Sequence, residues 1–294
     1  MDLLAQLNRA MEYIEEHISG DLTLESVSSV TMYSAYHFQR LFCYIADMPL
    51  SEYIRRRKMT LAAYKLQNDN LKIIDLAAKY GYDSADSFTR AFVKQHGITP
   101  SAARSKGAML KIYPPLTFQI RIRGVQEMNW RIEEKESFEV FGIERVFGND
   151  QGGEVPAFWT ECHQNGSYEK LFDDAGGIRV SHDERRGVCT INAICGYRNT
   201  GETSFPYMLC AFKNDKCKTD SYTTALVPKY TWAIFRSNYS DTIGLQIPQL
   251  FSRAYSEWLP SSGYDKADGP DLEIYGVADN GKYFEEVWLP VIKK

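Results

Sequence analysis

The sequence lacks the residue patterns that mark metal sites, membrane spans and secretion. Its six cysteines include no Cys-x-x-Cys pair and no histidine at zinc-ligand spacing, so they are interpreted as reduced core residues. No apolar run approaches the roughly 20 residues of a membrane helix, and the N-terminus lacks the basic and then apolar order of a signal peptide. We therefore expect a cytoplasmic protein with no metal, cofactor or membrane partner.

The sequence also has little net charge, but its charged residues are unevenly distributed along the chain. The 294 residues carry a formal net charge of −4. Residues 1–106 contain 13 Lys or Arg and 12 Asp or Glu, whereas the remainder contains 21 and 26. The length predicts two or three domains. A weakly basic front and an acidic back suit two different partners.

A short repeat dominates the first third of the chain. Residues 34–42 read SAYHFQRLF, and residues 84–92 read SADSFTRAF, 50 positions later. In each copy a short helical stretch and a break precede a serine that can cap the next helix, which is the helix-turn-helix pattern. Residues 51–67 contain no Gly or Pro and predict a long helix between the two units.

The repeat has a core face and an outer face. Paired phenylalanines four residues apart share one side of each helix, and Arg40 and Arg90 lie on another side. Recognition helices present their outer faces to base edges, and successive major-groove faces are about 34 Å apart. By chemistry alone, Gln39, Arg40 and Arg90 suit contacts to adenine, guanine or phosphate. One chain could therefore read two adjacent half-sites.

These residues resemble the DNA-binding domain of the AraC/XylS family of bacterial transcription regulators. The resemblance rests on YHFQRLF, GYDSADSFTRAF, the central SEYIRRRKM and the closing HGITPSAAR, and it covers residues 3–106. Met32 departs from it, because the family usually has Gly at this turn. The resemblance implies that base contacts come from Tyr36, Gln39, Arg40, Ala85, Asp86, Thr89 and Arg90.

Two features of this region have alternative interpretations. Asp86, in the first turn of its helix, is either a favourable charge at a helix N-terminus or an acceptor for a cytosine amino group. The run Arg55–Lys58 either grips backbone phosphates or forms a solvated face. At most half of its cations can reach one surface, and Arg55 is the candidate contact.

The pattern changes after residue 106. Residues 107–126 are expected to be a linker that includes a strand, and residues 127–294 a second domain. Alternating stretches predict strands, interrupted by helices near EVPAFWTECHQNG and IGLQIPQLFSRAYSEWLPSSG. Val155-Pro156 and Ile247-Pro248 begin these helices 92 residues apart. The whole chain is thus expected to be multidomain: an all-α double helix-turn-helix domain, then an α+β antiparallel-sheet domain with two similar halves.

Two acids stand inside aromatic strands of the second domain. Alternation places Glu273 on one sheet face with Tyr275, and Glu286 on one face with Phe284 and Trp288. Such carboxylates either face water or receive a cationic or hydrogen-bonding ligand, and the pattern alone favours water. It likewise favours core roles for a set of aromatic residues: Phe158, Trp159, Trp232 and Trp258.

Residues 127–292 resemble the GyrI-like effector-binding domain, which follows an AraC-type domain in right-origin-binding-protein-like regulators. The ending LEIYGV and YFEEVWLPVIKK carries this resemblance. It implies a cleft between the halves, floored by Glu273 or Glu286, with the choice left open. The expected effector-binding set also contains Phe158, Trp159, Tyr230, Trp232, Trp258 and Tyr275.

The leading hypothesis is a transcription regulator, not an enzyme, that binds double-stranded DNA and senses a small, cationic amphipathic effector. RNA polymerase is a further candidate partner. One alternative is a small-molecule hydrolase using Glu273 or Glu286 with Tyr230 or Tyr275. Another is a DNA-binding protein whose second domain only docks a partner.

Overall fold

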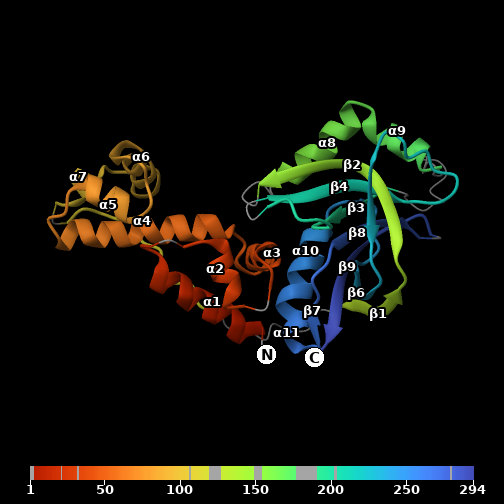
Figure 1. Ribbon diagram of the computed structural model, residues 1–294, viewed down its shortest axis with the longest axis horizontal. Coiled ribbons are helices and arrows are strands. Elements are labelled where there is room, and N and C mark those ends of the chain that lie inside the picture. The colour runs from red at the N-terminus through yellow and green to blue at the C-terminus, as the bar shows by residue number, and fades with distance from the viewer. Residues whose placement is uncertain are drawn as a thin grey trace. The chain divides into compact units, whose positions relative to one another are not determined.

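A computed structural model describes most of the chain in two compact units, Met1–Ile122 and Arg123–Lys294, shown in Figure 1. The described residues are 3–20, 22–31, 33–105, 107–118, 127–148, 154–176, 191–201, 204–278 and 280–294. Within them, no helix combines the length and the apolar character that crossing a membrane requires.

The first unit contains seven helices in its described residues, followed by a non-helical segment, residues 107–118. Its helices are α1 (Leu3–His17), α2 (Leu24–Ser29), α3 (Ala35–Ala46), α4 (Leu50–Asn68), α5 (Ile73–Lys79), α6 (Ala85–His96) and α7 (Pro100–Ala103). The predicted caps are confirmed: Thr23, Ser34 and Ser84 each accept a backbone N–H from the first turn of the helix that follows. The two predicted helix-turn-helix units are therefore α2 with α3 and α5 with α6.

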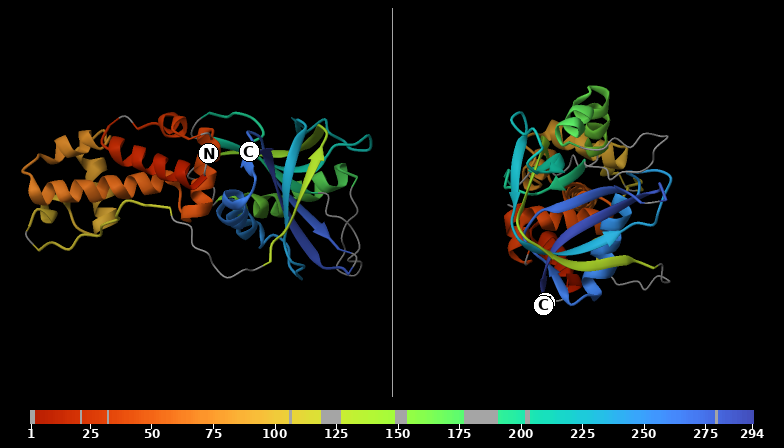
Figure 2. Two further views of the ribbon diagram at one scale, coloured as in Figure 1. Left: turned by 90° about the horizontal axis from the view of Figure 1, so that it is seen from below. Right: turned by 90° about the vertical axis from the view of Figure 1, so that its right-hand side faces the viewer.

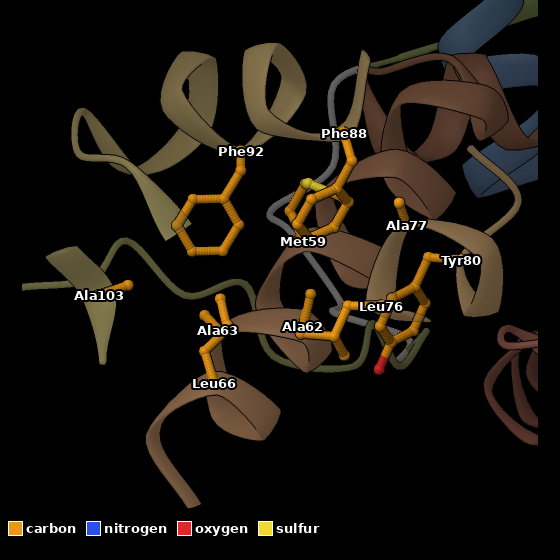
Figure 3. Packing of buried hydrophobic residues seen from close by; sticks show 10 residues of the cluster. All are labelled: Met59, Ala62, Ala63, Leu66, Leu76, Ala77, Tyr80, Phe88, Phe92 and Ala103. Atoms are coloured by element: carbon orange, nitrogen blue, oxygen red, sulfur yellow. The ribbon is translucent and has the colours of Figure 1, made fainter. Parts of the chain in front are cut away.

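The repeated phenylalanines form the cores of these two units, as predicted. Phe38 and Phe42 are buried with ring centroids 6.4 Å apart, and Phe88 and Phe92 are buried at 5.8 Å. Figure 3 shows the second core, in which Phe88 and Phe92 face Met59 and other side chains of α4. Side chains of helix α4 thus form one side of the core of the second helix-turn-helix unit, α5 with α6.

The first part of the expected linker is bound to the helical unit. Residues 107–118 contain no strand. The Asn8 side chain exchanges two hydrogen bonds with the backbone of Phe118, and the Tyr53 hydroxyl accepts from the Leu116 N–H at 3.2 Å. Because polar backbone groups near a core must be satisfied, these bonds replace the expected strand pairing. Residues 119–126 lie outside the described part.

The second unit is built on an antiparallel sheet of nine strands in its described residues. The strand order is β1-β6-β9-β8-β3-β4-β2-β5, and β7 pairs with β9. The strands are β1 (Asn129–Lys135), β2 (Phe138–Gly148), β3 (Asn192–Cys195), β4 (Ser204–Phe212), β5 (Thr223–Val227), β6 (Tyr230–Arg236), β7 (Tyr264–Lys266), β8 (Asp271–Val277) and β9 (Tyr283–Lys293).

The predicted duplication is visible in this order. In the first half, β2 leads through α8 (Val155–Gln164) and α9 (Ser167–Asp174) to β3 and β4. In the second half, β6 leads through α10 (Ile247–Arg253), the π-helix η2 (Ala254–Trp258) and α11 (Leu259–Ser261) to β8 and β9. The halves meet where β3 pairs with β8. The predicted fold class is confirmed.

The sheet has two different faces. One, here called the helix face, contacts α8 and η2 through side chains such as Tyr207 and Asp271. The sheet is curved, as Figure 2 shows, and its other face is here called the concave face. Side chains of β2, β5, β6, β8 and β9 meet there in one buried cluster, and the rings of Phe138 and Trp232 are 6.4 Å apart. Adjacent residues of a strand therefore enter different environments.

Candidate DNA-binding and effector sites

Helix α3 presents the first expected recognition surface. Its serine cap, Ser34, also bonds the ring of the buried His37, which fixes the first turn. Gln39 and Arg40 are half-buried, and the Arg40 guanidinium donates to the Tyr44 hydroxyl at 2.9 Å while lying 5.4 Å from its ring. Arg40 is thereby held along the helix axis. The side chain of Tyr36 lies outside the described part.

Helix α6 presents the second expected surface. Asp86 and Arg90 are exposed, and Ala85 and Thr89 are half-buried beside them. Asp86 does occupy the first turn of the helix, where a carboxylate is favourable next to the helix dipole. Its second expected role, accepting from a cytosine, requires the same exposed position.

The cationic run in α4 is largely engaged within the protein. Arg55 and Arg56 both bond Glu52, at 2.7 and 2.5 Å. Arg57 is buried and pairs with Glu15 at 2.6 Å. The fourth cation, Lys58, donates to the Tyr80 carbonyl at 3.1 Å, and burial lowers its pKa. Arg57 and Lys58 thus connect α4 to α1 and to the end of α5, whereas Arg55, the candidate DNA contact, pairs with Glu52 of its own helix.

Glu273 lies on the helix face, near the junction of the two halves. It is 8% exposed and accepts hydrogen bonds from Tyr207 at 2.8 Å and Tyr275 at 2.9 Å. Burial, followed by the charge of Glu273, raises the pKa of the Tyr207 hydroxyl well above its usual value, so this hydroxyl stays protonated and donates. Glu273 is therefore a buried carboxylate that accepts hydrogen bonds from two tyrosine hydroxyls.

Two aromatic residues of α8 reach this carboxylate cluster. The Trp159 indole N–H donates to the Tyr207 hydroxyl at 2.9 Å, and its ring meets that of Tyr275 edge-on at 5.3 Å. Phe158 is buried beside Tyr207, with ring centroids 6.5 Å apart. The structure thus brings together four of the predicted residues, namely Phe158, Trp159, Glu273 and Tyr275.

Glu286 lies on the concave face with different partners. It bonds Arg131 at 2.8 Å, Arg236 at 2.7 Å and the Trp288 indole N–H at 2.8 Å. Burial raises its pKa, but the hydrogen bonds from these three residues outweigh burial and leave the pKa below its ordinary value. Glu286 therefore remains ionised and is neutralised by guanidinium groups.

The other predicted effector residues are separate from Glu273. Tyr230 and the fully buried Trp232 belong to the concave face, where their rings are 5.4 Å apart. Trp258 packs against Trp130 and Phe235, at 5.2 and 5.1 Å. Of the two pairs with Glu273 that the hydrolase alternative proposed, the structure contains Glu273 with Tyr275. Tyr230 lies with Trp232 instead.

Sequence reasoning missed Tyr207, which completes the Glu273 cluster. It lies on β4, separated from β8 by β3, and both strands pair with Cys195 of β3 through Tyr207 and Asp271. Only the strand order reveals this proximity, because the two tyrosine-bearing strands are far apart in the sequence. In the described residues, no group of three or more acidic, His or Cys side chains is arranged to hold a metal ion.

Comparisons with known proteins identify a family for each of the two domains. Residues 131–291 match the family of integron-associated effector binding proteins, and residues 27–106 match a helix-turn-helix domain family. The HTH-type transcriptional activator AarP of Providencia stuartii is 41% identical over 98 residues, 33% of this chain and 73% of AarP. The transcriptional regulator Rob of Salmonella typhimurium is 34% identical over 118 residues, 40% of this chain and 41% of Rob.

A solved structure of SAV2435 bound to tetraphenylphosphonium is also similar. It has 17% sequence identity and a TM-score of 0.43, over 56% of this chain and 94% of SAV2435. The relatives matched by the helical unit are transcription regulators rather than enzymes. The chain is thus a DNA-binding transcription regulator of the AraC family, and its C-terminal domain belongs to the family of integron-associated effector binding proteins.

Proposed function

We propose that one copy of this chain reads a two-part DNA site through α3 and α6, and that a lipophilic cation bound over Glu273 changes that reading. The chain would act in the cytoplasm, where it meets DNA and RNA polymerase. The observation that carries the proposal is the pair of capped helices with equivalent Phe cores and polar outer faces.

The outer residues suit different half-sites. Arg40 and Arg90 match the acceptors of guanine or a phosphate, and Gln39 matches adenine. Asp86 gives α6 a carboxylate where α3 has Tyr36, and a carboxylate accepts from the cytosine amino group. We therefore expect two half-sites of different sequence rather than a palindrome.

The environment of Glu273 supports a cationic effector. A carboxylate removed from water attracts a cation more strongly than an exposed one. The aromatic rings of Trp159 and Tyr275 lie close to Glu273, and aromatic rings bind organic cations through their π-faces. Glu286 lacks this potential, because Arg131 and Arg236 already neutralise it.

A randomised duplex library tests the DNA reading. Wild type is selected at one fixed salt concentration, beside Arg40→Ala and Arg90→Ala, because phosphate contacts alone give sequence-blind and salt-dependent affinity. We expect a two-part site whose halves are centred about one helical turn apart, with each variant relaxing one half by about 1–3 kcal/mol at a single base pair. Arg145→Ala, which removes a cation from the other unit, serves as the control. Enrichment of one half-site only would contradict a two-helix reader.

Coupling between the two units is tested with the same DNA. Tetraphenylphosphonium is the probe, since it is a lipophilic cation with aromatic groups. If it changes the affinity for DNA, DNA must change the affinity for the cation by the same factor. Cation binding without any effect on DNA affinity would leave the DNA reader in place but contradict regulation by this route.

A further inference from the structure

A pocket lies at the end of the sheet where β1 begins and β6 ends. Its volume is about 640 Å³. Two arginines, two aromatic side chains and three small polar residues line it: Asn129, Trp130, Arg131, Arg236, Ser237, Asn238 and Tyr239. No carboxylate is among these described lining residues. The pocket wall is therefore rich in donors and cationic.

The hydrogen-bonded group of charged side chains at this pocket carries a net positive charge. Arg131 and Arg236 share the single carboxylate of Glu286, which is 3% exposed and lies beneath them. Glu133 bonds Arg131 at 2.5 Å and Lys135 at 2.5 Å, so three cations meet two carboxylates. One positive charge remains in excess, and a bound monoanion would neutralise it.

The guanidinium groups are placed to donate to a ligand. The side chains of Arg131 and Arg236 are 38% and 37% exposed. Arg236 uses Nε and Nη2 on Glu286, which leaves the N–H groups of Nη1 available, and its guanidinium is held 4.1 Å from the Phe284 ring. An arginine fixed in this way is suited to oxyanions, because its planar donors match carboxylate and phosphate oxygens.

The walls indicate what is attached to the oxyanion. Trp130 is 49% exposed and Tyr239 is 53% exposed, and both line the pocket. Trp130 already meets the Trp258 ring at 5.2 Å and Tyr239 meets the Phe284 ring at 6.5 Å, so the exposed remainder of each ring is the part that can pack on an apolar group. The amide side chains of Asn129 and Asn238 add neutral hydrogen-bonding groups.

We infer that this pocket is a binding site for a small organic anion, consisting of a carboxylate or phosphate group on a planar apolar body. It is distinct from the Glu273 cluster, because its two arginines hold Glu286, which belongs to the opposite face of the sheet. The two sites are joined through β9, on which Glu286 precedes Val287, the partner of Glu273 in the sheet register. The inference does not depend on the cation-sensing proposal.

Isothermal titration of the full chain with benzoate and with phenyl phosphate tests the inference, and benzyl alcohol is the uncharged control. Ionic strength is held constant, because salt screens such contacts. We expect saturable one-to-one binding of an oxyanion and none of the alcohol. Binding of both oxyanions indicates a general oxyanion site, and binding of one identifies the preferred group. The absence of saturable binding for both would overturn the inference.

Matched variants locate the site. Arg236→Gln and Arg131→Gln are expected to weaken oxyanion binding about tenfold, the loss of one charged hydrogen bond. Arg145→Gln is the control, since Arg145 is 39% exposed, pairs with Glu161 and lies 4.3 Å from the Phe158 ring. An equal loss in Arg145→Gln would contradict the assignment.

A measurement on unaltered protein covers the case in which those variants fail to fold. In protein labelled with ¹⁵N-tryptophan, the indole signal of Trp130 is assigned by its absence in Trp130→Phe. Titration with benzoate or phenyl phosphate is expected to shift this signal along the same saturation curve as the heat. Binding that leaves the Trp130 signal unchanged would place the anion elsewhere and refute the inference.

Discussion

Replacing each of the two buried acids with its amide should separate ligand binding from stability. In Glu273→Gln, the amide oxygen still accepts from Tyr207 or Tyr275, so the free energy of unfolding should fall by only about 1 kcal/mol. In Glu286→Gln, Arg131 and Arg236 lose the carboxylate that holds them together. Because these guanidiniums retain contact with water, we expect a loss of about 2–3 kcal/mol.

The order of the two variants should be reversed for cation affinity: Glu273→Gln should lose affinity, and Glu286→Gln should keep it. A unit charge about 4 Å from Glu273 gains about 4 kcal/mol at an effective dielectric constant of about 20. Desolvation of the cation reduces this gain, so loss of the charge should cost about 2 kcal/mol, or about 30-fold in Kd. Glu286→Gln should bind the cation within about threefold of wild type, since its charge was already neutralised.

Calorimetric titration with tetraphenylphosphonium and thermal unfolding measure both effects on the same samples. The midpoint of the C-terminal domain should fall by roughly 4–12 °C in Glu286→Gln and much less in Glu273→Gln. Glu161→Gln, at an exposed carboxylate of α8, is the control for general loss of negative charge. Wild-type cation affinity in Glu273→Gln, with loss of affinity in a fully folded Glu286→Gln, would refute the assignment.

Three further predictions concern the stability of the scaffold. Gly142→Ala should prevent folding of the C-terminal domain or cost more than about 4 kcal/mol, because a Cβ would lie 1.8 Å from the Leu209 carbonyl oxygen; a wild-type urea midpoint would contradict this. Ser84→Ala should destabilise the helical unit by about 1 kcal/mol through loss of the α6 cap, and an unchanged denaturation midpoint would show that the cap is redundant. Burial raises the pKa of Glu15, but hydrogen bonds from Arg57 and Tyr53 outweigh it and leave the pKa below 4.5. The unfolded chain therefore binds this proton first, so the stabilisation is present above pH 4.5 and is lost as the pH falls through the lower folded pKa. Melts between pH 3 and 7 should show a smaller acid loss in Glu15→Gln than in wild type, and identical profiles would disprove the linkage.

The sequence predicted the helical unit in detail because its signals are local. A cap, a 3.6-residue apolar period and a repeated Phe pair each act within one or two turns. The same holds for alternation along β8 and β9, which correctly placed Glu273 with Tyr275 and Glu286 with Trp288. Such patterns determine which side chains share a face, and they do not require knowledge of distant contacts.

The short elements escaped prediction. Strands β5 and β7 have five and three residues, and α9 has eight residues inside a polar stretch. Their periodicity is too brief to separate from a loop, and their neighbours β2 and β9 stabilise them. The alternating stretch GVCTINAICGY, residues 187–197, also predicts a strand, but its first four residues lie outside the described part, as does Met32.

The partners of the candidate residues could not be predicted either. Nothing in the run Arg55–Lys58 shows that Arg57 pairs with Glu15, 42 positions earlier. Likewise, the choice between Glu273 and Glu286 depends on Arg131 and Tyr207, which tertiary structure alone brings near. The sheet face that a side chain occupies follows from local alternation, whereas the partners of a charged side chain are determined by the tertiary fold.

Helix α4 is bonded toward both recognition helices. The ring of Tyr53 packs on Phe42 of α3 at 5.8 Å. From α6, the Gln95 side chain donates to the Arg56 carbonyl, and the His96 ring forms a hydrogen bond with the Met59 carbonyl. Because α4 is in contact with both α3 and α6, these contacts resist a twist of one recognition helix relative to the other. Since one base pair turns the duplex by about 34°, a single inserted base pair would carry one half of an operator out of phase with the other. The spacing between the two halves of the operator would then be constrained as strictly as their base sequences.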